Sequence, residues 1–91
     1  MADRVRRRLV IEGRVQGVFF RESCRRQAES AGVAGWARNL DDGRVEVVLE
    51  GGAGLVEQVV AWCRTGPRQA VVTSVQVLDE EPEGLDGFRA R

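Results

Sequence analysis

The chain has 91 residues, 43% hydrophobic and 31% charged, which suits one small globular domain spanning residues 1–91. Fourteen basic and fourteen acidic residues cancel, so no net charge draws the chain toward nucleic acid or a membrane surface. All the basic residues are arginine and there is no histidine, which excludes Schiff-base lysines, phosphohistidine intermediates and histidine metal ligands.

The first predicted element is a strand over residues 5–12, where apolar and polar side chains alternate with period two. Three consecutive arginines, Arg6, Arg7 and Arg8, lie near its start. Because alternation divides them between two faces, we interpret them as a solvated strand edge and not as a nucleic-acid contact. No apolar leader or spanning run precedes or follows this strand, and we expect a cytoplasmic protein that does not contact membranes.

The stretch from Gly13 to Arg21 joins this strand to a predicted helix over residues 20–31. Its glycines allow the backbone to bend freely, and the following helix places the positive end of its dipole behind the turn. Main-chain N–H groups gathered there form an anion site, and the guanidinium of Arg21 can hold two oxygens of a phosphate. A cation is unfavourable at a helix N-terminus unless an anion is bound, which favours this functional interpretation of Arg21.

The remaining chain alternates strand and helix patterns. The first helix carries apolar residues at helical spacing and ends at Gly32, a typical C-cap residue, and Asp41-Asp42-Gly43 indicates a hairpin turn. The other elements are a strand over 35–40, a strand over 45–50, a helix over 53–64 with an apolar stripe of Leu55, Val59, Trp62 and Cys63, a strand over 70–78, and a short last strand around Leu85 and Phe88.

The order βαββαβ predicts an α+β fold, the ferredoxin-like α/β sandwich, with an antiparallel sheet and two helices on one face. In this topology the first and second strands run in the same direction, with the third between them. Asn39, near the end of the second strand, should therefore face the Gly13–Arg21 turn across a shallow cleft, with the strand axes roughly 10 Å apart.

Such a cleft suits phosphoryl transfer, which depends mainly on positioning and electrostatics. A phosphate held by main-chain amides and Arg21 could be attacked in line by a water that Asn39 holds. Acyl phosphates fit best, because a carboxylate leaves without protonation and the cleft shows neither a general acid nor a metal site. Asn39 could alternatively be only a turn former before Asp41.

Two signatures in the chain resemble those of the acylphosphatase family: Gly13 with Val15-Gln16-Gly17-Val18 and Phe20-Arg21, and Gly35-Trp36-Ala37-Arg38-Asn39 with Gly43, Val45 and Gly51. Gly66-Pro67 with Ala70 and Val72 is also similar, so the resemblance extends from Val5 to Phe88. It departs at Ser23 and Cys24, where the family often has an aromatic residue or histidine and then threonine.

The resemblance implies cofactor-free hydrolysis of the carboxyl-phosphate bond to a carboxylate and inorganic phosphate. It implies that Arg21 binds the phosphate and that Asn39 orients the nucleophilic water. The implied phosphate-binding main-chain amides are those of Gln16, Gly17, Val18, Phe19, Phe20 and Arg21, with Gln16 contributing backbone and not side chain. The expected partners are a small-molecule acyl phosphate and inorganic phosphate or a similar anion as product or inhibitor, bound by a monomer.

Other functions are compatible with the same fold. A non-catalytic anion-binding or regulatory domain remains open, because binding and turnover use the same loop. An RNA-binding module would place stacking aromatic residues on the central strands, and residues 5–12 and 45–50 have none. A metal carrier would need a Cys-x-x-Cys loop, whereas Cys24 and Cys63 lie far apart in the sequence.

Several side chains have structural interpretations. Cys24 and Cys63 should be buried thiols whose helix ends lie at the same end of the domain. Trp62 should lie in the core, and Trp36 either in the core or along the cleft. The acidic pair Glu80 and Glu81 should be solvated surface.

Overall fold

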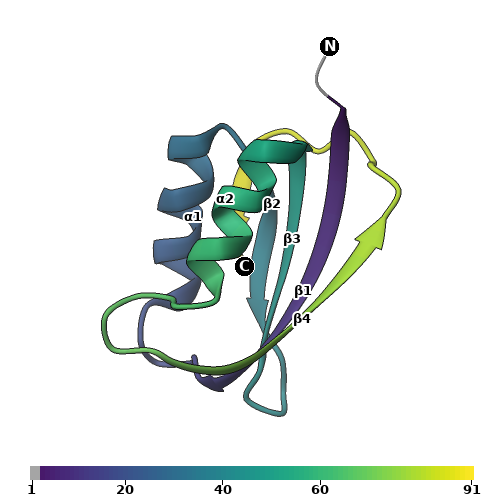
Figure 1. Ribbon diagram of the computed structural model, residues 1–91. Coiled ribbons are helices and arrows are strands. Elements are labelled where there is room, and N and C mark those ends of the chain that lie inside the picture. The colour runs from purple at the N-terminus through teal and green to yellow at the C-terminus, as the bar shows by residue number, and fades with distance from the viewer. Residues whose placement is uncertain (1–2) are drawn as a thin grey trace.

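The computed structural model describes residues 3–91, which form a sheet covered on one face by two helices (Figure 1). In chain order the elements are β1 (Arg4–Arg14), α1 (Phe20–Ala31), β2 (Ala34–Asn39), β3 (Val45–Gly52), α2 (Ala53–Cys63), β4 (Val71–Glu80) and β5 (Phe88–Ala90). This is the ferredoxin-like α/β sandwich that the order of patterns predicts, with one short strand added.

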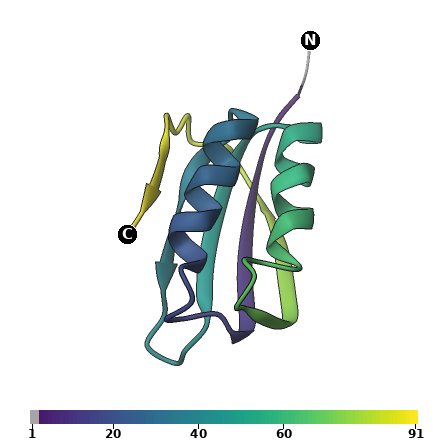
Figure 2. The same ribbon diagram turned by 90° about the vertical axis from the view of Figure 1, so that its left-hand side faces the viewer.

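The sheet has the strand order β4-β1-β3-β2-β5, so β1 and β3 are central. Three of its four pairings are antiparallel, whereas β5 runs parallel to β2, with Gly35 opposite Phe88. Strands β1 to β4 therefore form the antiparallel sheet that the sequence predicts, and the short strand β5 extends it with a parallel pairing. Figure 2 shows β5 at the edge of the sheet beside α1. It brings the last residues of the chain alongside the strand that carries Asn39.

The core lies between the helices and the sheet. Phe20, Cys24 and Ala28 of α1 are buried, as the predicted stripe requires. On α2 the buried residues are Val56, Val59, Val60 and Cys63, whereas Leu55 is 42% exposed and Trp62 is only partly buried. The predicted stripe on α2 is wrong at Leu55, because Val56 is the buried residue in this turn. Both residues are apolar, so periodicity alone does not select the buried face.

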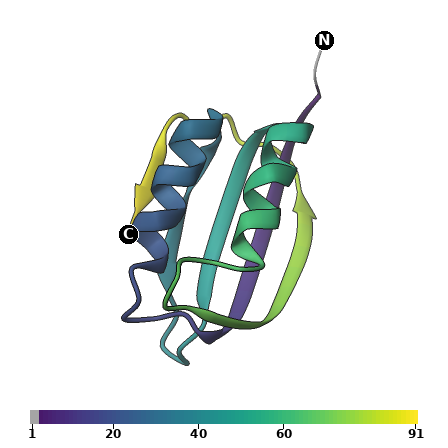
Figure 3. The ribbon, with the colours of Figure 1, turned by 60° about the vertical axis from the view of Figure 1, so that its left-hand side comes forward.

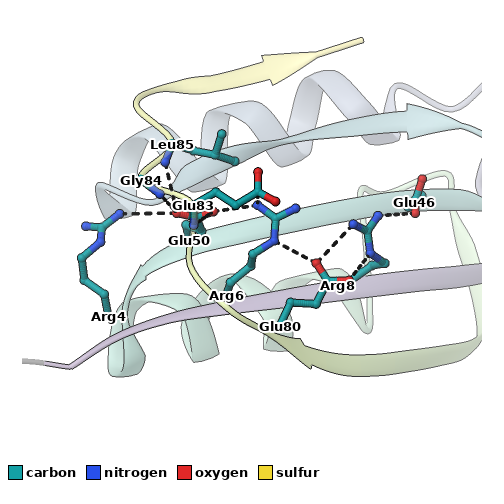
Figure 4. Close-up of polar contacts among 9 residues, drawn as sticks. All are labelled: Arg4, Arg6, Arg8, Glu46, Glu50, Glu80, Glu83, Gly84 and Leu85. Atoms are coloured by element: carbon teal, nitrogen blue, oxygen red, sulfur yellow. Dashed lines mark hydrogen bonds and ion pairs between the residues drawn. The ribbon is translucent and has the colours of Figure 1, made fainter.

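The arginines of β1 do not form a solvated edge, because β1 is a central strand. Arg6 is only 4% exposed and its guanidinium contacts the carboxylates of Glu50 at 2.6 Å and Glu80 at 2.8 Å (Figure 4). Arg8 bonds Glu80 at 2.6 Å and Glu46 at 2.5 Å. Glu80 is thus also an ion-pair partner and not simply solvated surface. On the open face of the sheet, the arginines of β1 lie between glutamates of β3 and β4. The charges buried there are therefore paired with charges of opposite sign.

The two cysteines lie in the core between α1 and α2, as expected. Both are fully buried and carry free thiols. The contact with the thiol of Cys24, together with burial, raises the pKa of Cys63 well above its usual value. Both therefore behave as small apolar side chains. Within residues 3–91, no helix combines the length and the apolar character needed to cross a membrane.

Candidate active site

Strand β1 has a bulge at Gly13, just before the loop that leads to α1. The pairing of β1 with β4 shifts register between Glu12 and Gly13, and Gly13 has a φ of +129°. A Cβ there would lie 2.0 Å from the carbonyl oxygen of Val71, so no other residue fits without moving β4. Beyond the bulge β1 still pairs with β4, Gly13 with Val72 and Arg14 with Val71, before the loop toward α1 starts.

The loop then passes through two residues in the left-handed region. Gly17 has a φ of +74° and Phe19 a φ of +62°. Alternating backbone conformations of this kind build the main-chain concavities that bind anions. Phe19 is also the N-cap residue of α1 and provides no side-chain cap, so the N–H groups of the first turn have no capping side chain. The helix dipole therefore points its positive end into the loop.

Arg21 lies in this first turn and is partly buried. Its Nη1 donates a hydrogen bond to the main-chain carbonyl oxygen of Arg91, which follows β5. Arg91 is itself fixed by the hydrogen bond that its N–H donates to the carbonyl oxygen of Ala37, at 2.8 Å. The parallel pairing of β5 with β2 thus holds the guanidinium beside the loop, a contact that no pattern in the sequence predicts.

Asn39 is the last residue of β2 and is exposed. It lines the same hollow as Arg21, and this hollow has a volume of about 450 Å³. The other residues around this hollow are Val15, Gly17, Phe19, Phe20, Glu22 and Ala90. The structure therefore brings together five of the predicted site residues, namely Gly17, Phe19, Phe20, Arg21 and Asn39. Gln16 and Val18 do not line it, although both belong to the same loop.

The side chain of Gln16 has a role that the sequence did not suggest. Its Nε2 donates hydrogen bonds to the carbonyl oxygens of Leu40, at 2.8 Å, and of Arg44, at 3.0 Å. These two residues flank the turn between β2 and β3, directly after Asn39. Gln16 therefore ties the β1–α1 loop to the segment that carries Asn39, so the expectation that it contributes only backbone is incomplete.

Trp36 lies on the open face of the sheet, away from this hollow. The guanidinium groups of Arg8, Arg38 and Arg91 lie 5.6, 5.5 and 4.8 Å from the centre of its ring. Trp36 is therefore neither core nor cleft, which corrects both alternatives drawn from the sequence. Trp62 packs its ring 5.4 Å from that of Phe20, at the border of the core.

The polar side chains around the hollow are the guanidinium of Arg21, the carboxamide of Asn39 and one carboxylate. Glu22 is that carboxylate, and the guanidinium of Arg25 lowers its pKa, so at neutral pH it is ionised and cannot supply a proton. Across the described part of the chain, residues 3–91, no three Cys, Asp or Glu side chains are grouped in a way that could hold a metal ion. The arrangement can bind an oxyanion and a water, and it suits a leaving group that departs as an anion.

Comparisons with known proteins show which family this sequence and fold resemble. The family model described as Acylphosphatase matches residues 7–90. An acylphosphatase of Natronomonas pharaonis is 50% identical over 91 residues, covering 100% of this chain and 99% of the relative. One from Thermococcus kodakarensis is 56% identical over 86 residues, covering 94% of each chain. The solved structure of an acylphosphatase from Coxiella burnetii superposes with a TM-score of 0.93 at 37% identity, covering 98% of this chain and 94% of that one.

Proposed function

The chain belongs to the acylphosphatase family of enzymes, and we propose that it hydrolyses acyl phosphates by direct attack of an oriented water on a bound phosphate. In this proposal the loop amides of residues 16–21 and the guanidinium of Arg21 bind the phosphate. The carboxamide of Asn39 orients the water. The reaction uses no metal.

The proposed chemistry is a single in-line displacement. An oxygen–phosphorus bond forms from the water, and the bond between phosphorus and the acyl oxygen breaks, releasing a carboxylate and inorganic phosphate. The proton of the water passes to a phosphate oxygen of the substrate, because Glu22 is the one carboxylate among the described residues that line the hollow and is already paired with Arg25. Arg21 and the helix dipole neutralise the charge that remains on the equatorial oxygens.

The observation that supports this proposal most directly is the shared hollow of Arg21 and Asn39 at an uncapped helix N-terminus. One residue arrives on the helix after β1 and the other at the end of β2, 18 positions later in the chain. Within this hollow of about 450 Å³ they offer a forked cation and a neutral carboxamide. The first suits a phosphate and the second suits a water.

The test is release of inorganic phosphate from acetyl phosphate by the purified protein, measured with and without a chelator. We expect turnover that the chelator does not change, and no comparable turnover of an alkyl phosphate such as glycerol phosphate, whose leaving group needs a proton. Inorganic phosphate should inhibit competitively. Loss of activity on adding the chelator would contradict the metal-free proposal.

We further propose a monomer in the cytoplasm with no nucleic-acid partner, in keeping with the balanced charge of the chain. Size-exclusion chromatography with light scattering tests the oligomeric state. A salt-dependent binding assay with single-stranded RNA tests the absence of nucleic-acid binding, because phosphate contacts would make any affinity fall as salt rises.

A further inference from the structure

The open face of the sheet ends in a basic surface at the edge formed by β2 and β5. Figure 3 shows both helices in front of the sheet, with β5 in yellow at the edge, so neither helix covers the opposite face. Phe88 points into the core, and Arg89, the next residue, therefore points to this open face, opposite Trp36 of β2. Arg38 and Arg91 each follow two residues later in their segments and lie on the same face. We call Trp36, Arg38, Arg89 and Arg91 the β5 patch; its three arginines are exposed.

The charges on the open face alternate from strand to strand until they reach this patch. Glu46 of β3 bonds Arg8 of β1 on one side, at 2.5 Å, and Arg38 of β2 on the other, at 2.6 Å. Beyond β2 in the strand order come Arg89 and Arg91, where a carboxylate would continue the alternation. Among residues 3–91, neither of these two guanidinium groups forms an ion pair. The series of paired charges is therefore incomplete at β5.

The guanidinium groups also crowd a single aromatic ring, that of Trp36. Those of Arg8, Arg38 and Arg91 lie 5.6, 5.5 and 4.8 Å from the centre of the ring. Each of these contacts is favourable by itself, because the face of an indole ring attracts a cation. The positive charges nevertheless repel one another, and no ion pair within residues 3–91 offsets the charge of Arg91. An anion bound beside the ring would offset this repulsion.

The spacing of the arginines indicates an extended ligand. Side chains on one face of a strand are two residues apart, which is roughly 6.7 Å along the strand. Arg89 and Arg91 have this separation in the sequence, and so do alternate side chains of an extended acidic peptide. A guanidinium can pair with a carboxylate through two parallel hydrogen bonds. Nucleic acid fits less well, because guanidinium groups already lie over the ring of Trp36, where a base would stack.

We propose that the β5 patch binds an extended acidic segment of a partner protein. Carboxylates at alternate positions of that segment pair with Arg89 and Arg91. Arg38 bonds Glu46 through its Nε and directs its terminal nitrogens to a further carboxylate of the segment. The bound segment completes the alternation of charge at this edge of the sheet. The interaction does not depend on the proposed hydrolysis, and it adds a class of partner to the protein.

The test is a titration of the ¹⁵N-labelled protein with acetylated hexaglutamate at low ionic strength, followed by NMR. Trp36 and Trp62 each provide an indole N–H signal, and Trp36→Phe identifies which signal belongs to which residue. We expect hexaglutamate to shift the signal of Trp36 and not that of Trp62, which packs against Phe20 at the border of the core. The affinity should fall as salt is added, because exposed charges are screened. Hexaglutamine, which has the same length but no charge, should shift neither signal.

Arg38→Gln combined with Arg89→Gln removes two charges from the β5 patch. Arg91 is left unchanged, because its main chain is bonded to the candidate active site. Glu46 keeps its bond to Arg8, so the substitution of Arg38 leaves no buried carboxylate unpaired. An exposed ion pair contributes up to roughly fivefold to an affinity. We therefore expect the Kd of hexaglutamate to rise roughly tenfold in the double variant.

The matched control is Arg64→Gln combined with Arg68→Gln, which removes two exposed arginines that follow α2, outside the β5 patch. Its Kd for hexaglutamate should equal that of the wild type. A wild type in which hexaglutamate leaves the Trp36 signal in place overturns the proposal, and so does an unchanged Kd in the double variant of the patch. Tighter binding of the RNA hexamer hexauridylate than of hexaglutamate would assign the patch to nucleic acid and would also overturn it.

Discussion

Arg21 and Asn39 line one hollow but have different tasks in the proposed mechanism, and their variants should separate binding from rate. Asn39→Ala removes the group that orients the water and leaves the phosphate site intact. We expect kcat to fall roughly 10²-fold, the usual cost of losing one preorganised polar group, while the inhibition constant of inorganic phosphate stays within about threefold. Arg21→Ala should instead weaken phosphate inhibition and lower the rate together.

A matched control is Arg64→Ala, which removes an exposed arginine at the end of α2, outside the hollow. Its kinetics should equal those of the wild type, which would show that general loss of positive charge is not responsible for the effect at Arg21. If Asn39→Ala hydrolyses acetyl phosphate at the wild-type rate, the role that we propose for its carboxamide is wrong.

At the scale of elements, the site depends on how the β1–α1 loop is held against the turn after β2. Gln16 makes this connection through the carbonyl oxygens of Leu40 and Arg44. Gln16→Leu removes both hydrogen bonds, but each carbonyl keeps a main-chain donor, from Gly43 and from Leu40. We therefore expect little loss of stability and a fall of roughly tenfold in kcat, because a small displacement of positioned groups is costly in rate.

A double-mutant cycle decides whether Gln16 acts through Asn39. If it does, Gln16→Leu should lower kcat in the wild type and have almost no further effect in Asn39→Ala. Gln58→Leu, at an exposed position on α2, is the control for loss of a glutamine and should change neither the stability nor kcat. Equal effects of Gln16→Leu in both backgrounds would mean that Gln16 only stabilises the loop.

The sequence predicts those elements that carry local signals. It predicts helix α1 to the residue, because a glycine-containing loop precedes Phe20 and Gly32 ends the helix with a φ of +74°. Strand β5 carries no comparable signal, since its three residues are ordered by pairing with β2 and not by their own pattern. From the sequence one could therefore predict that Arg21 and Asn39 lie near each other, but not that Arg91 holds the guanidinium of Arg21.

Long-range pairing explains the other differences. The chain places Arg6 and Glu50 in register through β1 and β3, but 44 residues separate them, and period-two alternation does not reveal a buried ion pair. The side chain of Gln16 likewise finds its partners 24 and 28 residues away. Motif spacing predicts which residues gather at an edge of the sheet. Which side chains bond there depends on distances that only the folded chain defines.

At the scale of the whole molecule, charged side chains cross the open face of the sheet from β2 to β4. In order along the chain of contacts they are Arg38, Glu46, Arg8, Glu80, Arg6 and Glu50. The carboxylate of Glu50 also accepts hydrogen bonds from the N–H groups of Glu83, Gly84 and Leu85, and Figure 4 draws all of these residues except Arg38. This charge ladder joins four strands and the segment that leads to β5. It therefore stabilises the sheet and helps place the end of the chain.

Glu50 is the most sensitive position of the charge ladder, because it is fully buried and accepts hydrogen bonds from a guanidinium and from three main-chain N–H groups. Glu50→Ala leaves the buried guanidinium of Arg6 without this partner, which typically costs about 3–5 kcal/mol. We expect that loss in the free energy of unfolding from urea denaturation. Glu57→Ala removes an exposed glutamate on α2 together with its surface ion pair to Arg7. It should cost less than about 1 kcal/mol, as is usual for such a pair. Equal effects of the two variants would contradict a structural role for the charge ladder.

Glu80 gives the charge ladder a pH dependence that can be measured. The guanidinium groups of Arg8 and Arg6 lower its pKa from 4.5 to about 2. A carboxyl group with a depressed folded-state pKa stabilises fully above its unfolded-state pKa and loses that contribution as pH falls through the folded value. The difference in unfolding free energy between the wild type and Glu80→Gln should thus be constant near neutral pH and shrink between pH 4.5 and about 2. A difference at Glu80 that stays constant down to about pH 2 would mean that its ion pairs do not stabilise the fold.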